Sequence, residues 1–520
     1  MKKYLTYLLL LTLLTTSGFA YDIDYEGDTP FGLANTTNDH PEPEFMEVDE
    51  GFNNDSTATD EEGRTLKTYP NIRIAGYYGS LSSAPSGFRS YMTNSLGPAV
   101  IDYYQAALKV KYPINGRLIL SHYSSVCNIP IPSNMRRDGV PADLLILFVS
   151  THDSGKNWVA EAFSCILSVQ SKRPLIGKVN VNRALYKDPG SDILLHEKNI
   201  YLMLHEVAHV LGFSGHMFRY YLDENGRQRS GHILTRTLDG ISVKVINVPP
   251  LTTRLRRFFG CSSLAGAYME GTGSSATAGS HFERRMLPFD ALTSGLIYQQ
   301  SLSEFTLAML EGSGWYLPDY SMADPYWFGQ GQGCNFLMQS CTNPNFKFEE
   351  FCSGRSRGCT VQGRGGGTCA GDIRSNNCRF VFPNVNYDCE NPSASRNARY
   401  PSVETYGRNE NSKCFTGTLS PTSSSASSTN FCFKYQCVGQ GLNTQLRVRV
   451  GNLYYTCKYK GILRPRGYNG YFDCPDPLTF CQTVGKPACP RGCMGRGICV
   501  DGKCQCRRGF FGKDCAENRR

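Results

Sequence analysis

The sequence lacks any long apolar run after its first twenty residues, and it has no cysteine before Cys127. A helix that spans a bilayer needs about 20 consecutive apolar residues, so no membrane helix is expected in the rest of the chain. Residues 512–520 are polar, which excludes the hydrophobic tail of a glycolipid-anchor signal. Basic and aromatic residues do not combine into a nucleic-acid-binding motif, so nucleic acid is not an expected partner.

The one apolar run lies in residues 1–20, where Lys2 and Lys3 precede it and Gly18-Phe19-Ala20 follow it. A basic start, a short apolar core and a small-x-small end are typical of a cleaved secretory signal peptide. We therefore expect an exported, extracellular protein, which can still associate peripherally with a cell surface.

The next segment is acidic. From Tyr21 to Arg64 the chain has fourteen acidic residues and one basic residue, although the whole chain carries a net charge of +9. A polar, acidic segment with few apolar residues is not expected to fold alone. It is either a solvated tail or a propeptide that lies against the basic body of the protein by charge complementarity.

All 22 cysteines lie between Cys127 and Cys515. An even number in an exported chain predicts a framework of up to eleven disulfides. Beyond residue 330 they crowd among Gly, Ser and Asn, which is typical of a region held by bridges rather than by a large core. Six cysteines in residues 489–515 have the spacing C-x3-C-x5-C-x4-C-x-C-x8-C, which closely resembles an epidermal-growth-factor-like module.

Apolar periodicity outlines the elements of the first 330 residues. Strands are expected at 71–78, which alternates, and at 143–150, which is apolar throughout. Helices are expected at 97–112, 197–213 and 301–316.

The chemistry lies in the helix expected at 197–213. His205 and His209 stand four residues apart, so both imidazoles lie on one face of the helix and can bind one ion. Zn²⁺ held by three neutral protein ligands keeps a fourth position for water, whose acidity rises toward neutrality. Glu206 is then the expected general base, which takes the proton of that water.

The third ligand is less evident from the spacing. Gly212 can end the helix in a sharp turn, and the compact pattern HExxHxxGxxH would place a histidine where Gly215 stands. His216 is one residue late, and such a slip would rotate its side chain away from the ion. His232 could reach the ion only through a loop, and His196 has no HExxH partner of its own.

Three segments carry a family resemblance. "HEVAHVLGFS", "GSHFERRMLPFDALTSG" and "TLAMLEGSGWYLPDYSMADPYWFGQGQGCNF" closely resemble the leishmanolysin-type metallopeptidases, which are metzincins with a long insertion before the third zinc histidine. The resemblance runs from about residue 71 into the cysteine-rich part. It implies that His281, 72 residues after His209, is the third ligand of a single zinc ion.

Two features depart from the family pattern. The family places a methionine eleven residues after the distal histidine, in the Met-turn, and this chain has Leu292 there. Leu and Met have similar volumes, so the apolar floor can be filled. Residues 21–126 contain no cysteine, so a propeptide cysteine cannot keep the enzyme latent by binding the zinc. In the acidic segment, His40 is a residue that could reach the metal instead.

The expected protein is a secreted zinc metalloendopeptidase that hydrolyses protein substrates. The resemblance implies that cell-surface or matrix proteins are among them, with a link to cell adhesion. The alternative is an adhesion or binding protein on a weak or inactive peptidase scaffold.

The expected fold is an α+β metzincin-like catalytic domain, with a mixed sheet and the active-site helix, followed by a disulfide-rich, mostly β region. The expected divisions are a signal peptide (1–20), an acidic, disordered propeptide-like segment (21–66), an N-terminal catalytic subdomain (67–212), an insertion with the C-terminal catalytic subdomain (213–330), a cysteine-rich domain (331–485) and the growth-factor-like module (486–520).

Overall fold

The computed structural model of the chain describes residues 42–51, 57–59, 65–238, 241–271, 279–295, 297–343, 345, 348–354, 356–371, 375–407, 410–421, 429–439, 443–482, 497–500, 503–506, 510–511 and 517–518. The expected signal peptide and His40 lie outside these residues. Over the described ranges, every helix is too short or too polar to cross a bilayer.

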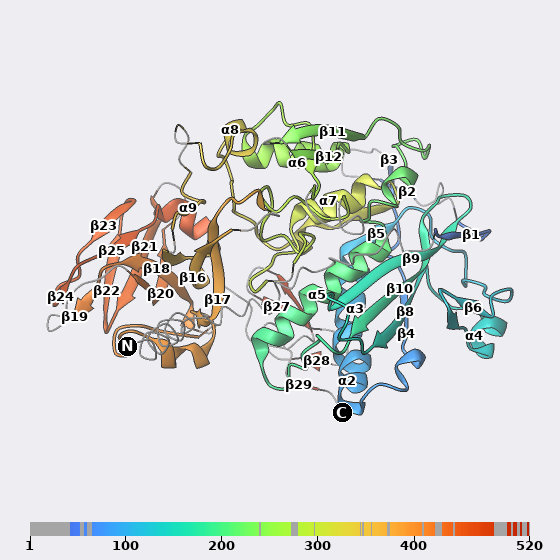
Figure 1. The fold of residues 1–520 in the computed structure, drawn as a ribbon, viewed down its shortest axis with the longest axis horizontal. Coiled ribbons are helices and arrows are strands. Elements are labelled where there is room, and N and C mark those ends of the chain that lie inside the picture. The colour runs from blue at the N-terminus through green and yellow to red at the C-terminus, as the bar shows by residue number, and fades with distance from the viewer. Residues whose placement is uncertain are drawn as a thin grey trace, which may run out of the picture.

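A five-stranded mixed sheet organises the first part of the chain (Figure 1). Its strand order is β1-β9-β10-β8-β4. β9 runs antiparallel to β10, whereas the other neighbouring pairs are parallel. The strands are β1 (Glu44–Met46), β4 (Ile74–Tyr77), β8 (Leu144–Thr151), β9 (Ala160–Ser168) and β10 (Pro174–Asn182).

The apolar run of β8 is explained by burial on both faces of this sheet. Leu144, Ile146 and Phe148 point into the main core, while Leu145 and Leu147 point into a second, smaller core on the opposite face. Successive side chains of a strand alternate between faces, so a strand covered on both sides must be apolar throughout.

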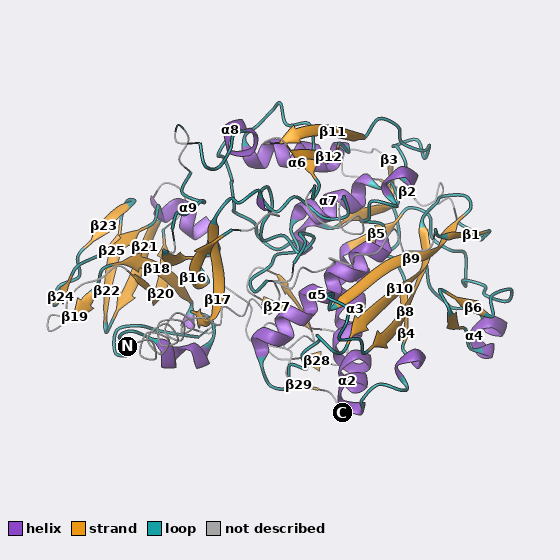
Figure 2. Ribbon diagram, viewed as in Figure 1, coloured by secondary structure: helices purple, strands orange, loops and turns teal. Residues whose placement is uncertain are grey.

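Helices cover one face of the sheet (Figure 2). α5 (Ile193–Leu211) packs on β9 and β10, and α3 (Gly97–Ala107) packs on β4 and against α5. The Tyr104 hydroxyl joins the two helices by donating to the Leu204 carbonyl at 2.7 Å. α2 (Ser86–Tyr91) contributes to the same main core, whereas α4 (Ser133–Asp138), β6 (Ser125–Val126) and β7 (Ile129–Pro130) contribute to the smaller core on the opposite face.

The expected elements are found, with shifted ends. The helix expected at 97–112 ends at Ala107, because Leu108–Val110 forms β5 and pairs with β14 (Tyr316–Pro318). The helix expected at 301–316 is the shorter α7 (Glu304–Gly312) for the same reason. Both helix ends are therefore set by the pairing of β5 with β14, two strands that are far apart in the sequence.

The chain after α5 builds a second unit beside the sheet. β12 (Ile241–Ile246) pairs with β11 (Ile233–Leu238) and β13 (Ala267–Tyr268), and α6 (Pro249–Phe259) packs against α7. Pairing of β14 with β5 returns the chain to the N-terminal part. The main core is therefore shared by the two units.

The rest is mainly β, as expected for the cysteine-rich region. A three-stranded sheet and a six-stranded sheet follow, and Figure 1 shows them on the side of the molecule away from β1. The elements are α8 (Cys334–Met338), β15 (Arg357–Cys359), β16 (Gly365–Ala370), β17 (Phe380–Asp388), β18 (Ser412–Gly417), β20 (Thr429–Val438), β21 (Gln445–Val450), β22 (Leu453–Cys457), β23 (Gly461–Leu463), β25 (Phe472–Cys474) and α9 (Pro477–Gln482), with short strands β26 (Gly497–Val500) and β27 (Lys503–Cys506) beyond.

Eight disulfides join cysteines of the described ranges. Cys127–Cys165 ties the β6–β7 hairpin to β9, and Cys261–Cys334 ties α6 to α8. The other six lie within the cysteine-rich region: 341–378, 352–369, 359–414, 389–432, 437–481 and 457–474. Cys504 and Cys506 are also bridged. The fold is therefore the expected α+β domain with a disulfide-rich β region.

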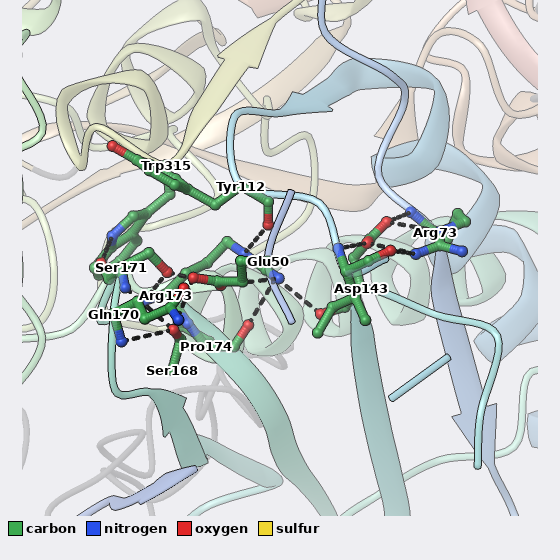
Figure 3. A network of polar contacts seen from close by, with 11 residues as sticks. Glu50, Arg73, Tyr112, Asp143, Ser168, Gln170, Ser171, Arg173, Pro174 and Trp315 are labelled. Carbon is green, nitrogen blue, oxygen red and sulfur yellow. Dashed lines mark hydrogen bonds and ion pairs between the residues drawn. The ribbon is translucent and has the colours of Figure 1, made fainter. Parts of the chain in front are cut away.

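Residues 42–51 of the acidic segment lie against the rest of the fold. β1 pairs with the end of β9, and the side chain of Glu50 is only 2% exposed. Figure 3 shows Glu50 beside Arg173: two carboxylate oxygens accept bonds from Ser168 and Ser171 at 2.8 Å each, and the guanidinium lies 3.7 Å away. Arg173 is fully buried and also donates to the carbonyl of Tyr112 at 3.1 Å.

This network predicts that Glu50 is needed for stability. Removing one partner of a buried ion pair leaves the other charge uncompensated, which costs about 3–5 kcal/mol. Glu50→Ala should therefore lower the free energy of unfolding by about that amount in denaturant titrations. The control is Glu42→Ala, because Glu42 pairs with Arg219 on the surface and such pairs contribute at most about 1 kcal/mol. Equal effects of the two changes would contradict the structural role of Glu50.

Candidate metal centre

Helix α5 carries two of the histidines. Asp192 caps it by accepting the backbone N–H groups of Leu194 and Leu195 at 2.9 and 3.1 Å, which starts the helix before the expected position 197. It ends at Gly212, whose φ of 116° is accessible to glycine without steric cost. His205 and His209 lie on the last two turns and are 8% exposed each.

The third histidine, His281, lies on a hairpin. β13 continues into Glu270, and the chain returns so that Met269 and Phe282 form an antiparallel bridge. The N–H of Glu270 donates to the His281 carbonyl at 2.8 Å. This pairing brings His281, also 8% exposed, against α5.

The end of the insertion packs where the third histidine of a compact site would lie. Gly215 occupies the position at which the compact pattern has its third histidine, and its N–H donates to the Ser280 hydroxyl at 3.0 Å. A β-carbon on Gly215 would lie 3.3 Å from the carbonyl of Gly279. The residues just before His281 therefore fill the space beside Gly215, and a distal histidine takes the place of a local one.

The three imidazoles converge. Nε2 of His205 lies 2.9 Å from Nε2 of His209 and 3.2 Å from Nε2 of His281. One nitrogen from each residue lies within 4.8 Å of the other two. Two nitrogens bound to one zinc ion in tetrahedral geometry, with Zn–N of about 2.0–2.1 Å, are about 3.3 Å apart, so the donor set fits that metal.

The other ring nitrogens fix the tautomers. Nδ1 of His205 donates to the Ala291 carbonyl and Nδ1 of His209 to the Phe213 carbonyl, at 2.6 Å each. A neutral imidazole that donates from Nδ1 has only a lone pair at Nε2. Lone pairs that face one another without a shared proton repel, and a cation between them removes that repulsion.

Burial favours uncharged groups here. Loss of hydration, reinforced by His281, lowers the pKa of His205 to about 3, so the ring is neutral at physiological pH and able to bind a metal. Glu206 is 2% exposed, and burial raises the pKa of its carboxyl well above the usual value, with a smaller contribution from Glu161.

Leu292 lies in a buried loop that bonds to the segment carrying His281. Its N–H donates to Asp290 at 2.7 Å, and its carbonyl accepts the N–H of Phe282 at 2.9 Å. The neighbouring residue Ala291 supplies the carbonyl that holds His205. Leu292 itself is fully buried. The loop at the Met-turn position thus contacts both the helix histidine and the hairpin of the distal one.

The remaining histidine candidates lie outside the group that the described residues form. His232 is a core residue that bonds the Phe218 carbonyl at 2.8 Å and stacks on Tyr221. His196 bonds the Tyr91 hydroxyl at 2.6 Å, and His216 is partly exposed. The structure brings His281, the residue implied by the family resemblance, to His205 and His209.

The comparisons with known proteins agree with this geometry. The sequence profile of the leishmanolysin family matches residues 86–376. The chain belongs to the leishmanolysin family. The resemblance read from the three sequence segments is therefore confirmed, and so is the growth-factor-like tail, because a tenascin-type growth-factor profile matches residues 488–516.

Curated relatives carry peptidase names. The chain is 28% identical over 239 residues to a leishmanolysin-like peptidase of Caenorhabditis elegans, which covers 39% of this chain and 36% of the relative. It is 28% identical over 363 residues to the ciliated left-right organizer metallopeptidase of Mus musculus, covering 64% and 50%. A leishmanolysin homolog of Crithidia fasciculata is 26% identical over 258 residues, covering 49% and 37%. The matched region spans about a third to a half of the length of these relatives.

Leucine at the Met-turn position leads to a stability prediction. Leu292→Met conserves volume and should change the free energy of unfolding by less than about 1.5 kcal/mol. Leu292→Ala opens a cavity in the main core and should cost about 2–5 kcal/mol. Denaturant unfolding of both variants tests this. A methionine variant as unstable as the alanine variant would show that the loop does more than fill space.

Proposed function

We propose that this leishmanolysin-family protein is a secreted, zinc-dependent endopeptidase that hydrolyses peptide bonds of protein substrates. The observation that carries the proposal is the convergence of three buried imidazole nitrogens from His205, His209 and His281, whose Nε2 atoms face one another. The peptidase names of the relatives support the reaction class.

One zinc ion would be held by these three histidines. When bound, zinc supplies Lewis-acid polarisation of a peptide carbonyl and lowers the pKa of water at its fourth position. The chain contributes a dry, prearranged donor set, because the three rings are buried and the tautomers of His205 and His209 are fixed by the carbonyls of Ala291 and Phe213.

Glu206 is the proposed general base. It follows His205 directly on α5 and is buried, and burial raises the pKa of its carboxyl. The base must start the step ionised, and the positive charge of a bound zinc ion would favour that form against the effect of burial. A carboxylate with a raised pKa binds a proton more readily, so the ionised group is suited to take the proton of the attacking water. The same carboxyl would then pass that proton to the leaving amine.

Strand β9 is the proposed platform for substrate. β1 covers only its end, at Ile166–Ser168, and over the described ranges no strand pairs with the same edge at Ala160–Cys165. Glu161 on this part of β9 lies close enough to interact electrostatically with Glu206. An extended polypeptide could add to this edge by main-chain hydrogen bonds, which suits a protease that acts on proteins.

The expected divisions of the chain remain proposals, as do cell-surface or matrix substrates and peripheral surface association. Latency would depend on steric or electrostatic cover by the acidic segment. Because Glu50 is part of the fold, a truncation that tests this should end before Glu42: removal of residues 21–41 should raise activity if they are inhibitory.

The alternative is an adhesion or binding protein on an inactive scaffold. The growth-factor-like tail and Leu292 favour it, whereas the buried Glu206 beside three converging imidazoles favours catalysis. A metal assay with a chelator-sensitive protease assay separates the two, because a pure binding protein would show no chelator-sensitive cleavage.

The base is tested by Glu206→Gln. The amide keeps the size of the side chain but cannot take a proton, so zinc content should stay at the wild-type level while casein cleavage falls by about 10²–10⁴-fold. Metal analysis and a fluorescent casein assay measure the two quantities. Undiminished cleavage would refute the role of Glu206.

The ligand set is tested by His281→Ala. Loss of one of three ligands should remove most of the zinc at low micromolar free metal, while His216→Ala, a matched change of a histidine outside the cluster, should leave the zinc content unchanged. Metal loss from the His216 variant with retention in the His281 variant would reassign the ligand.

A further inference from the structure

We propose that Glu270 is a positioning residue for the metal centre: it holds the ring of His281 so that Nε2 faces His205 and His209. The inference rests on the proposed zinc site and extends it to a residue that sequence spacing does not indicate. Glu270 precedes His281 by eleven residues and lies across the hairpin from it.

The three histidines are held differently at Nδ1. His205 and His209 donate to the backbone carbonyls of Ala291 and Phe213. Nδ1 of His281 instead lies 3.2 Å from Oε2 of Glu270. Within the described residues neither Nδ1 of His281 nor Oε2 of Glu270 has a formed hydrogen bond, so each is the nearest partner open to the other at this distance. Of the three groups that face an Nδ1 atom, only the Glu270 carboxylate belongs to a side chain.

Glu270 is itself held in place. It is 3% exposed, and its Oε1 accepts the Ser294 hydroxyl at 2.7 Å. Its N–H donates to the His281 carbonyl at 2.8 Å, and its carbonyl accepts the N–H of Gly279 at 2.9 Å. Backbone and side chain therefore fix the carboxylate on the hairpin and on the loop that contains Leu292.

This arrangement has a chemical consequence for the metal. A carboxylate on Nδ1–H keeps the proton there, leaves the lone pair on Nε2 and makes the imidazole a stronger donor. It also brings a negative charge near a site whose three ligands are all neutral. Partners of this kind change metal affinity by about 10–100-fold when they are removed.

The test measures zinc affinity rather than activity. The dissociation constant of zinc for the full-length protein is determined by competition with a chromophoric chelator, and the melting temperature of the metal-free protein is measured beside it. Glu270→Ala should weaken zinc binding about 10–100-fold. Glu270→Gln keeps an oxygen acceptor without the charge, and its affinity should lie between those of wild type and Glu270→Ala. Ser294→Ala should weaken binding less than Glu270→Ala.

Glu283→Gln is the matched control, because Glu283 is a buried glutamate on the same hairpin whose carboxylate accepts the N–H of Gly271 at 3.3 Å. It should bind zinc like wild type. Wild-type affinity in Glu270→Ala, or an equal loss in Glu283→Gln, would overturn the assignment. If Glu270→Ala does not fold, Glu270→Gln decides alone: weaker binding supports the assignment and unchanged binding overturns it. Failure of the wild-type protein to bind zinc would instead overturn the proposed function.

Discussion

The site depends on the meeting of three imidazole lone pairs in a buried space. Two come from successive turns of α5, and the third comes from a hairpin 72 residues further along the chain. Without a cation these nitrogens repel one another, so the surrounding structure must hold them together before any metal binds. The fold supplies this through the loop around Leu292, which bonds His205 through Ala291, the hairpin through Phe282 and Glu270 through Ser294.

The insertion between the second and third histidines can be understood in the same physical terms. A compact site needs its third histidine three residues after the glycine that ends the helix. Here Gly215 stands at that position and leaves room for Gly279 and Ser280, so the segment that precedes His281 packs where the local ligand would be. The site requires an imidazole at that place, and the imidazole can belong to a residue that is near in the sequence or far along it.

Much of this was predictable from sequence. Apolar runs and the HExxH spacing placed β8, α5 and the two helix histidines, because those patterns follow local periodicity. Residue spacing alone did not identify the third ligand among His196, His216 and His232, and the family resemblance indicated His281. Glu270 and Ser294 could not be found from spacing, since their roles arise from a hairpin and a loop that meet only in the folded chain. The ends of the two helices also differ in how far sequence predicts them. The end of α5 is marked by Gly212, whereas the end of α3 at Ala107 depends on the pairing of β5 with β14.

The acidic segment shows what composition leaves open. Its charge is compatible with a solvated tail or with a segment that lies against the basic body. At Glu50 the carboxylate meets a buried guanidinium and two hydroxyls, a set of partners that composition does not reveal.

X-ray absorption spectroscopy of the zinc-loaded protein tests the central claim most directly. The account predicts three imidazole nitrogens and one oxygen at about 2.0–2.1 Å from the metal. A shell containing sulfur at about 2.3 Å, or fewer than three imidazoles, would contradict it.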